Sequence, residues 1–226
     1  MPQSPTPTVA LFAAALGLAG LLSMSLASAQ VPPLREPVHR DAVAALTAGT
    51  LLVAARHLPD SNFSKTVILL GDVTRGGAVG VVLNRRSTVP LARVFPQLVP
   101  NLATASLAFL GGPVETTRTM ALIRAAQGPA GTRHVVDGVH LATAREAVEA
   151  AITAGTTATH LRIYLGYAGW SPGQLEAETG QGAWHVLPGD ADVVFDPDPA
   201  SAWQRQIART DVMQARQVEL SPRPRS

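Results

Sequence analysis

Residues 165–176 of the chain read Leu165-Gly166-Tyr167-Ala168-Gly169-Trp170-Ser171-Pro172-Gly173-Gln174-Leu175-Glu176. Two large aromatic residues stand among glycines here, in a chain of which only 4% is aromatic. An apolar run at residues 161–165 precedes the aromatic pair. The Ser-Pro-Gly-Gln segment that follows is typical of a helix capping box with proline at the first helical position. The pattern therefore predicts a strand that leads through a glycine–aromatic junction into a capped helix.

Apolar runs along the rest of the chain predict a sheet. Runs of strand length occupy residues 50–55, 66–70, 78–84, 106–110, 120–124 and 183–187, and another at 135–141 is interrupted by Asp137-Gly138. Continuous apolar runs favour strands that are covered on both faces. We therefore expect the α/β fold class, as an α+β mixed sheet flanked by helices.

Three further segments have helical signals. Residues 90–99 are amphipathic, and Pro96 inside them should kink or shorten the helix. Thr143 and Glu146 have the spacing of a second capping box, before a helix that Gly155 ends. A last helix should begin at Asp198-Pro199. The sheet and these helices together predict a single domain.

Composition narrows the class of protein. The chain has 226 residues, 46% of them hydrophobic and 15% charged, which is typical of one globular domain with tails. The formal net charge is only +2 and the arginines are scattered, which argues against a nucleic-acid-binding surface. The chain has no cysteine, which excludes a disulfide framework, a thiolate nucleophile and a zinc–cysteine site.

The N-terminal residues predict export. Residues 9–27 carry no charge and lead into Ala27-Ser28-Ala29, a pattern that suits signal peptidase, so we expect cleavage after Ala29 and a periplasmic or secreted protein. Residues 1–8 contain no lysine or arginine, which leaves open an uncleaved anchor in the inner membrane. A true start at Met24 would instead make the protein cytoplasmic. The expected organisation is a signal peptide or anchor at 1–29, a proline-rich linker at 30–45, a domain at 46–212 and a disordered tail at 213–226.

Tyr167 and Trp170 are the first candidates for a ligand site. They precede a predicted helix N-terminus, where free backbone N–H groups favour an anion, and their flat faces suit a ligand or peptide. The glycine turn Gly111-Gly112-Pro113 would line the same groove. The alternative is that both aromatic side chains fill the core at the junction.

A second candidate site is polar. Asn62 and Ser64 lie in one predicted loop, while Asn84 and Arg85 end a predicted strand. If the sheet brings them together, they would form a cleft that a hydrolase could use. Asn62 is more typical of a turn former that hydrogen-bonds its own backbone, and the sequence has no Gly-x-Ser-x-Gly nucleophile elbow.

No cofactor or metal site is expected. The six histidines have no metal-ligand spacing, and His134 and His140 would meet only if the fold happened to bring them together. An aspartate cluster also lacks the regular ligand pattern of a calcium loop, so we expect its members to cap helices and form turns: Asp190, Asp192, Asp196 and Asp198.

Three blocks of the chain, in this order, resemble the YqgE/AlgH family of bacterial proteins. They are Gly49-Thr50-Leu51-Leu52-Val53-Ala54 with Asn62-Phe63-Ser64, Val67-Ile68-Leu69-Leu70 and Gly77-Ala78-Val79-Gly80-Val81-Val82-Leu83-Asn84-Arg85; Phe109-Leu110-Gly111-Gly112-Pro113-Val114; and Gly166-Tyr167-Ala168-Gly169-Trp170 with Gln174-Leu175-Glu176, Trp184 and Phe195-Asp196. The similarity covers about residues 48 to 208. It implies a single α/β domain and no catalytic residue, in a family of uncharacterised proteins and proposed transcriptional regulators.

The chain departs from the family pattern at two places. Arg86 stands where the family usually has proline, and Arg118-Thr119-Met120…Ile123-Arg124 replaces an Arg-Gly-Phe…Leu-His segment. If residues 118–124 form part of a common site, that site is altered here. An export signal is also unusual for a mostly cytoplasmic family, and an exported protein cannot act on DNA.

These observations together predict a non-catalytic binding or interaction module in the cell envelope. Its partner would be a protein or a small molecule, without nucleic acid, and with membrane contact only through an uncleaved N-terminal segment. The alternatives are a hydrolase-like enzyme with the polar cleft, or a cytoplasmic transcriptional regulator if the start codon is wrong.

Overall fold

The computed structural model describes residue 43 and residues 45–101 and 106–220, all within the unit Arg35–Ser226. The predicted signal peptide or anchor and nearly all of the predicted linker lie outside the described residues. Within the described part, no helix is both long and apolar enough to cross a membrane.

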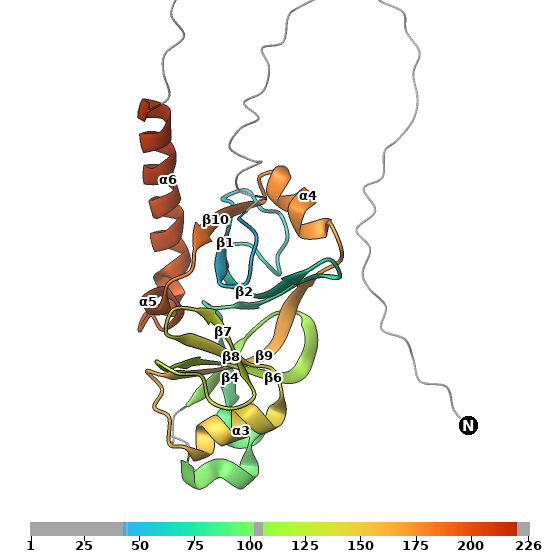
Figure 1. Ribbon diagram of the computed structural model, residues 1–226, viewed down its shortest axis with the longest axis vertical. Helices are drawn as coiled ribbons and strands as arrows, with labels where there is room; N and C mark the ends of the chain where they lie inside the picture. Colours follow the sequence, from blue (N-terminus) through green and yellow to red (C-terminus); the bar gives the residue numbers. More distant parts are fainter. Residues whose placement is uncertain (1–42, 44, 102–105, 221–226) are drawn as a thin grey trace, which may run out of the picture. The chain divides into compact units, whose positions relative to one another are not determined.

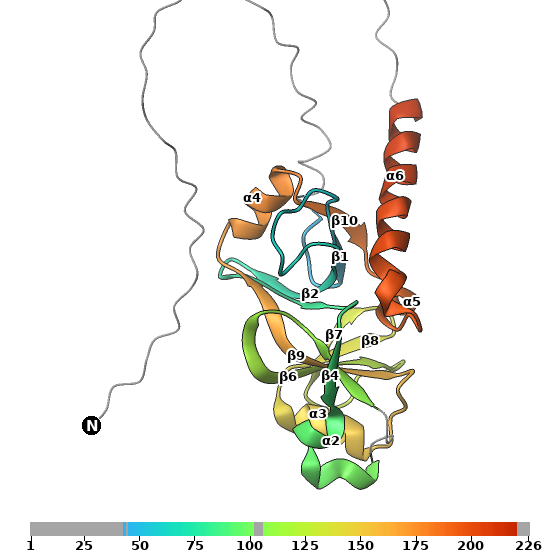
Figure 2. The same ribbon diagram turned by 180° about the vertical axis from the view of Figure 1, so that it is seen from behind.

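A curled sheet dominates the domain (Figures 1 and 2). Its strands follow the spatial order β10-β1-β2-β3-β9-β6-β8-β7, with β4 and β5 attached beside β9. Of the strand pairs in the described residues, only β5 with β9 is parallel. The expectation of a mixed α/β sheet is thus correct only in part, because the sheet is mostly antiparallel and dominates over the few helices. The strands are β1 (Thr50–Ala54), β2 (Val67–Thr74), β3 (Gly77–Val82), β4 (Arg86–Pro90), β5 (Leu107–Leu110), β6 (Val114–Arg124), β7 (Thr132–Val136), β8 (Val139–Ala142), β9 (Leu161–Trp170) and β10 (Trp184–Pro188).

The curl brings β7 close to the start of β1. Gly49 has a φ of +88°, and a Cβ added to it would lie 1.9 Å from the carbonyl oxygen of Val135 in β7. Gly189 lies equally close to Gly49, since a Cβ added to Gly189 would be 1.9 Å from the carbonyl oxygen of Gly49. Glycine is required at these positions because the backbones touch directly. The contact places β2 and β3 opposite β7 and β8 across a concave surface.

The core has two parts, one on each side of the curled sheet. All five residues of β1 are buried, as the continuous apolar run predicted. β1 to β3 pack with the first turns of α6 in the larger cluster, while α2 and α3 cover part of β6 in the smaller one. The helices and 3-10 turns are α2 (Leu91–Val94), η1 (Pro96–Asn101), α3 (Arg145–Thr153), α4 (Gln174–Gly180), α5 (Ala191–Val194), η2 (Pro199–Ser201) and α6 (Ala202–Leu220).

Several local predictions need correction. The glycine–aromatic stretch is not a junction that follows the strand, because β9 continues to Trp170. α3 begins after Ala144 and has no side-chain cap, so the predicted box at Thr143 does not form. At α4 half of the predicted box is present, since the Gln174 side chain accepts from the Ser171 N–H at 3.0 Å. Pro96 does divide the helix expected at 90–99, as predicted.

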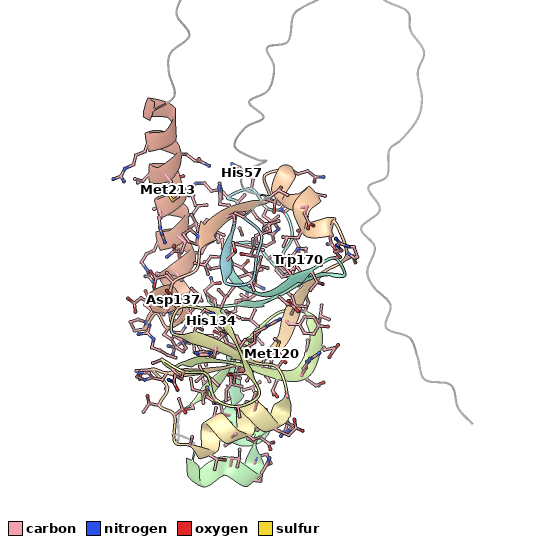
Figure 3. The ribbon with its side chains drawn as sticks, in the orientation of Figure 1. His57, Met120, His134, Asp137, Trp170 and Met213 are labelled. Atoms are coloured by element: carbon pink, nitrogen blue, oxygen red, sulfur yellow. The ribbon has the colours of Figure 1, made fainter. Side chains whose placement is uncertain are left out.

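The end of the domain also differs from the prediction. Residues 213–220, expected to be disordered, continue α6 as a helix, while 221–226 lie outside the described residues. The distal part of α6 extends away from the sheet (Figures 1 and 3), and Val212 and Met213 are exposed there. Residues 211–216 are all exposed, so they have no buried apolar stripe, which is the pattern that identifies a helix in sequence.

Candidate functional site

A concave surface of about 380 Å³ lies between the two halves of the curled sheet. Six strands contribute to it, namely β2, β3, β6, β7, β8 and β9. Its apolar floor is Val79, Met120 and Leu141, and the last two side chains are almost fully buried. Its polar rim includes Asp72, Arg118, Thr132, Arg133, Thr143 and Tyr167. We refer to it below as the concave site.

An irregular part of β6 forms one wall of the concave site. Val114 of β6 pairs with Tyr167 of β9, and the next pair is Thr119 with Leu165. The chain advances five residues along β6 but only two along β9 between these pairs, so β6 has three extra residues here. The extra length forms a bulge at residues 115–118, all of them exposed, which we call the β6 bulge. Its first residue, Glu115, has a φ of 44°, a backbone conformation that non-glycine residues rarely adopt.

Two arginines stand at opposite walls of the concave site, and each has a carboxylate partner. On the β7 wall, Arg133 lies 3.0 Å from Asp72 and donates to the carbonyl oxygen of Gly71 at 2.6 Å. On the β6 bulge, Arg118 lies 3.4 Å from Glu115. The Arg133 and Arg118 side chains are 47% and 45% exposed, so solutes can reach both guanidinium groups.

Tyr167 joins the β6 bulge to β9. Its hydroxyl donates to Glu115 at 3.0 Å, and the guanidinium carbon of Arg118 lies 5.7 Å from the centre of its ring. Partial burial, followed by the hydrogen bond to the Glu115 carboxylate, raises the pKa of Tyr167 above its usual value. The hydroxyl is therefore a neutral donor at physiological pH.

The glycines of the two sequence motifs meet behind this wall. A Cβ on Gly166 would lie 2.5 Å from the carbonyl oxygen of Gly112 and 3.2 Å from the Cα of Thr116 in the β6 bulge. One on Gly111 would lie 2.2 Å from the carbonyl oxygen of Gly166. The structure thus brings the Gly-Gly-Pro turn and the aromatic stretch together, but as touching backbones. Gly111 and Gly112 are packing residues and do not line the concave site.

Trp170 is a core residue, which corrects its predicted position in a groove. It is only 6% exposed and forms an aromatic cluster with Phe63 and Trp184, with ring centres about 6 Å apart. Figure 3 labels Trp170. One oxygen of the Glu178 carboxylate accepts from both indole N–H groups, at 3.0 Å from Trp170 and 2.8 Å from Trp184. The indole has no free polar group left to offer a ligand, so of the aromatic pair only Tyr167 reaches the concave site.

The structure brings the polar-cleft residues together, but they hold a loop. Asn84 accepts from the backbone of Val67 and donates to the carbonyl oxygen of Lys65, both at 2.9 Å. Arg85 donates to the carbonyl oxygens of Ser61 and Ser64. Asn62 is exposed, and its N–H donates to the Asp60 carboxylate, so Asp60 and not Asn62 forms the turn.

Desolvation lowers the pKa of Arg85, and the nearby charge of Asp60 partly offsets this. No hydrogen bond among the described residues connects the Ser64 hydroxyl to a base. The arrangement is typical of side chains that hold a loop in place rather than of a catalytic cleft.

The fold brings together two histidines whose spacing in the sequence does not indicate a shared site. His134 and His140 are direct cross-strand partners in the β7–β8 hairpin, with ring centres 5.5 Å apart. His140 is buried, and one ring nitrogen lies 3.2 Å from the carbonyl oxygen of Ala125. No cluster of three or more metal-ligating side chains occurs in the described residues.

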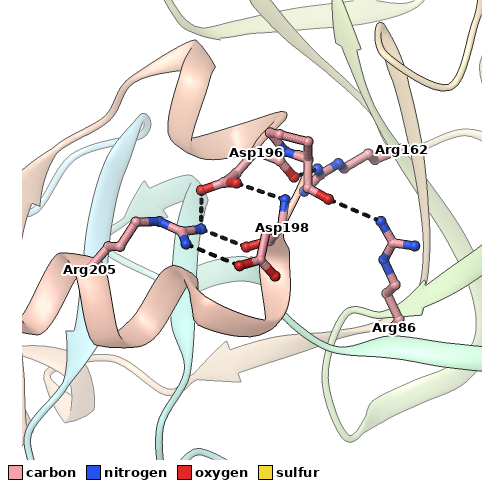
Figure 4. A network of polar contacts seen from close by, with 6 residues as sticks. Arg86, Arg162, Asp196, Asp198 and Arg205 are labelled. Atoms are coloured by element: carbon pink, nitrogen blue, oxygen red, sulfur yellow. Dashed lines mark hydrogen bonds and ion pairs between the residues drawn. The ribbon is translucent and has the colours of Figure 1, made fainter.

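Asp190 and Asp196 have the capping and turn roles expected of the aspartate cluster, whereas Asp192 and Asp198 form ion pairs with Arg124 and Arg205. Asp190 caps α5 by accepting from the N–H of Asp192 at 2.7 Å. Asp196 and Asp198 both pair with Arg205, which ties the start of α6 to the preceding turn (Figure 4). The carbonyl oxygen of Asp196 also accepts from Arg162 of β9.

Arg162 is a buried charge that the sequence analysis missed. It is 6% exposed, and its guanidinium carbon lies 4.9 Å from the ring centre of Phe109 and 5.9 Å from that of Phe195. Burial lowers its pKa. Its signal in the sequence is that it is the one charged residue within the apolar run 161–165. Arg86, the departure from the family pattern, lies beside it and contacts the carbonyl oxygen of Pro197 (Figure 4).

The sequence analysis also missed most of the rim of the concave site. Asp72 and Arg133 are paired only because the curl brings β2 and β7 together, and no local pattern indicates that contact. Arg118 and Met120 were noted only as members of the altered segment 118–124. That segment does form part of the site, since both residues line it.

Comparisons with known proteins place this geometry in context. The AlgH-like family (DUF179) matches residues 51–215. A UPF0301 protein of Anaeromyxobacter sp. (strain K) is 36% identical over 182 residues, which are 75% of this chain and 90% of the relative. A UPF0301 protein of Pseudomonas fluorescens (strain Pf0-1) is 37% identical over 150 residues, 64% of this chain and 78% of the relative.

Two solved structures are similar to the domain. The solution structure of the AlgH protein from Pseudomonas aeruginosa has a TM-score of 0.60 at 33% identity and covers 78% of this chain and 95% of that protein. A crystal structure of protein DIP2367 from Corynebacterium diphtheriae has a TM-score of 0.62 at 24% identity, covering 79% of this chain and 88% of that one. The second likeness supports the fold alone.

Proposed function

The chain belongs to the YqgE/AlgH family, and we propose that it is a non-catalytic binding module of the cell envelope. The observation that carries the proposal is the concave site, where two solvent-accessible arginines and several hydroxyl groups surround an apolar floor. Pockets that bind small molecules combine these features, with an apolar lining and a few placed polar groups. The envelope location rests on the uncharged residues 9–27 and the Ala27-Ser28-Ala29 pattern.

The rim of the concave site favours binding over catalysis. Catalysis by a nucleophile or a general base needs a reactive group held by a partner that activates it. The rim offers Arg118 and Arg133 in ion pairs and a tyrosine whose raised pKa keeps it protonated. These groups are suited to hold and orient a ligand.

Binding can be tested by NMR on the full-length chain with a library of small fragments. We expect saturable shifts of backbone amide signals that cluster at Arg118, Thr132 and Thr143. Thr143 is an exposed rim residue, so Thr143→Trp should fill the site and abolish these shifts without disturbing the core. Ala150→Trp places the same side chain on the exposed face of α3 and should leave them intact. Shifts scattered over the surface, or unaffected by Thr143→Trp, would refute the site.

The location is tested separately by sequencing the N-terminus of the native protein from fractionated cells. A mature chain that begins at Gln30 in the periplasmic fraction is the expected result. An intact N-terminus in the cytoplasm would refute the envelope assignment and would favour a cytoplasmic role, including the alternative of a transcriptional regulator.

A further inference from the structure

We infer that the concave site takes a ligand with a single carboxylate beside a short apolar body. The inference rests on the proposed function, because it names the chemical class that this site would bind. It depends on three features of the site: the balance of charge, the availability of the Arg118 guanidinium, and the size of the apolar floor.

The balance of charge disfavours a cation or a dianion more than it disfavours an anion with one charge. Two arginines and two carboxylates lie at or beside the rim, and each arginine already faces a carboxylate. A cation would have to displace an arginine from its partner. A dianion such as phosphate would meet Asp72 and Glu115 on both sides. A single carboxylate adds only one negative charge and can take the place of Glu115 at Arg118, whereas a dianion adds two.

Arg118 is the arginine that can exchange its partner. Arg133 is held by Asp72 at 3.0 Å and by the carbonyl oxygen of Gly71 at 2.6 Å. Arg118 has one hydrogen-bond partner among the described residues, Glu115, at the longer distance of 3.4 Å. An exposed pair of this kind contributes only about 0–1 kcal/mol, so an incoming carboxylate displaces it at little cost. The guanidinium can then bind both oxygens of the ligand in parallel.

Tyr167 and Thr143 complete the polar side of the site. The Tyr167 hydroxyl, which now donates to Glu115, can turn its proton to a ligand carboxylate next to Arg118. The Thr143 hydroxyl is exposed on the rim and has no hydrogen bond recorded within the described residues. The rim therefore offers a carboxylate one charged donor and two neutral donors.

The apolar floor sets the rest of the ligand. Val79, Met120 and Leu141 form the apolar floor that this rim surrounds, and the volume of about 380 Å³ is at the small end of ligand pockets. An unbranched methionine adapts its shape to small apolar groups. Two sources can supply this chemistry, a free short-chain acid or the C-terminus of a peptide that ends in an aliphatic residue.

The experiment compares matched probes by NMR titration of the full-length chain. The probes are 4-methylpentanoate, its uncharged amide, N-acetyl-Ala-Leu with a free C-terminus, the same peptide amidated, and inorganic phosphate. We expect one or both carboxylates to shift the amide signals of Arg118 and Thr143, and the amides and phosphate to bind at least tenfold more weakly. Binding of only the peptide acid identifies a chain terminus as the source, and binding of the free acid identifies a metabolite.

Variants of the site assign the carboxylate contact to Arg118. Arg118→Gln should weaken carboxylate binding by about tenfold or more, since a hydrogen bond to a charged group is lost. Arg93→Gln, on the exposed side of α2, should leave it unchanged. Tyr167→Phe gives a second readout and should weaken binding several-fold while the fold is kept.

Three results would overturn the inference: equal binding of an acid and its amide, tighter binding of phosphate, or no carboxylate shift at the site. If fragments of another class still bind there and Thr143→Trp abolishes their binding, the proposed function stands and only the ligand class is wrong. If no fragment of any class binds, both fail.

Discussion

Tyr167 and Trp170 lie three residues apart on β9, yet they serve two different regions of the molecule. Trp170 is buried against Phe63 and Trp184, and its indole N–H is satisfied by Glu178. Tyr167 is half-buried at the edge of the concave site, and its hydroxyl is shared with the exposed β6 bulge. One aromatic side chain therefore holds the domain together, and the other faces what the domain could bind. The comparison teaches that one motif can contain a structural residue and a site residue of similar chemistry.

The comparison predicts the largest effect for the aromatic cluster. Trp170→Ala should lower the free energy of unfolding by about 3–5 kcal/mol, because it empties a buried volume between two aromatic rings. Urea denaturation followed by circular dichroism measures this change. Tyr167→Ala, as the matched truncation at the surface, should cost clearly less. Equal losses for the two variants would show that Tyr167 is as much a core residue as Trp170.

The sequence does not predict that Trp170 is buried while Tyr167 reaches the concave site, although it does predict much of the fold. The strands at 50–55 and 66–70 were recognisable because continuous apolar runs reflect burial on both faces. The sequence predicts that the strand ends near Leu165 and that 166–170 is a junction, because glycines are typical of turns and loops. In the structure, Gly166 is needed for close contact with the β6 bulge. That bulge and the curl of the sheet are long-range features, and they leave no local pattern.

The site was predictable in the same limited sense. Tyr167 and the altered segment 118–124 were both noted, and both contribute to the concave site. The partner residues Asp72 and Arg133 come from strands that are far apart in sequence, so their contact is a product of the fold. By contrast, Asn84 and Arg85 do converge with the loop at 61–65, but the hydrogen bonds of their side chains go to backbone groups of this loop and of Val67.

A second prediction concerns the acceptor that serves both indoles. Glu178→Ala should cost about 1–3 kcal/mol of stability, because it leaves two largely buried N–H groups without an acceptor. Glu178→Gln keeps an acceptor oxygen at the same place and should cost less. Urea denaturation of the two variants side by side tests this. A loss as large for glutamine as for alanine would mean that the charge of Glu178, and not its position as an acceptor, stabilises the cluster.

The two tyrosines of the chain allow a third prediction, on pH. Both lie on β9, and burial raises the pKa of Tyr164 much further than that of Tyr167. A raised pKa in the folded state means that the stability from the neutral form is present below the unfolded pKa of about 10 and is lost as pH rises above it. Absorbance at 295 nm should show Tyr167 titrating in the folded protein, and Tyr164 only when the protein unfolds.

Tyr164→Phe is the variant that tests this order. It should remove the second step of the titration and move alkaline unfolding to higher pH, because the buried hydroxyl that must ionise is gone. Tyr167→Phe should remove the first step and leave alkaline unfolding almost in place. A single step that contains both tyrosines in the native protein would contradict the difference in environment between the two side chains.

The smallest effect on stability is expected for Tyr167, the more exposed member of the aromatic pair. Tyr167→Phe removes only the hydrogen bond to Glu115, between groups that water can reach, so the free energy of unfolding should change by no more than about 0.5 kcal/mol. The same variant should nevertheless weaken carboxylate binding at the concave site, because it removes a neutral donor beside Arg118. Calorimetric titration and thermal unfolding of one sample measure both quantities. A large loss of stability would mean that the hydroxyl holds the β6 bulge in place, and any loss of binding would then follow from the collapse of that wall. A small change in stability together with weaker binding would assign Tyr167 to the ligand, as its position on the rim requires.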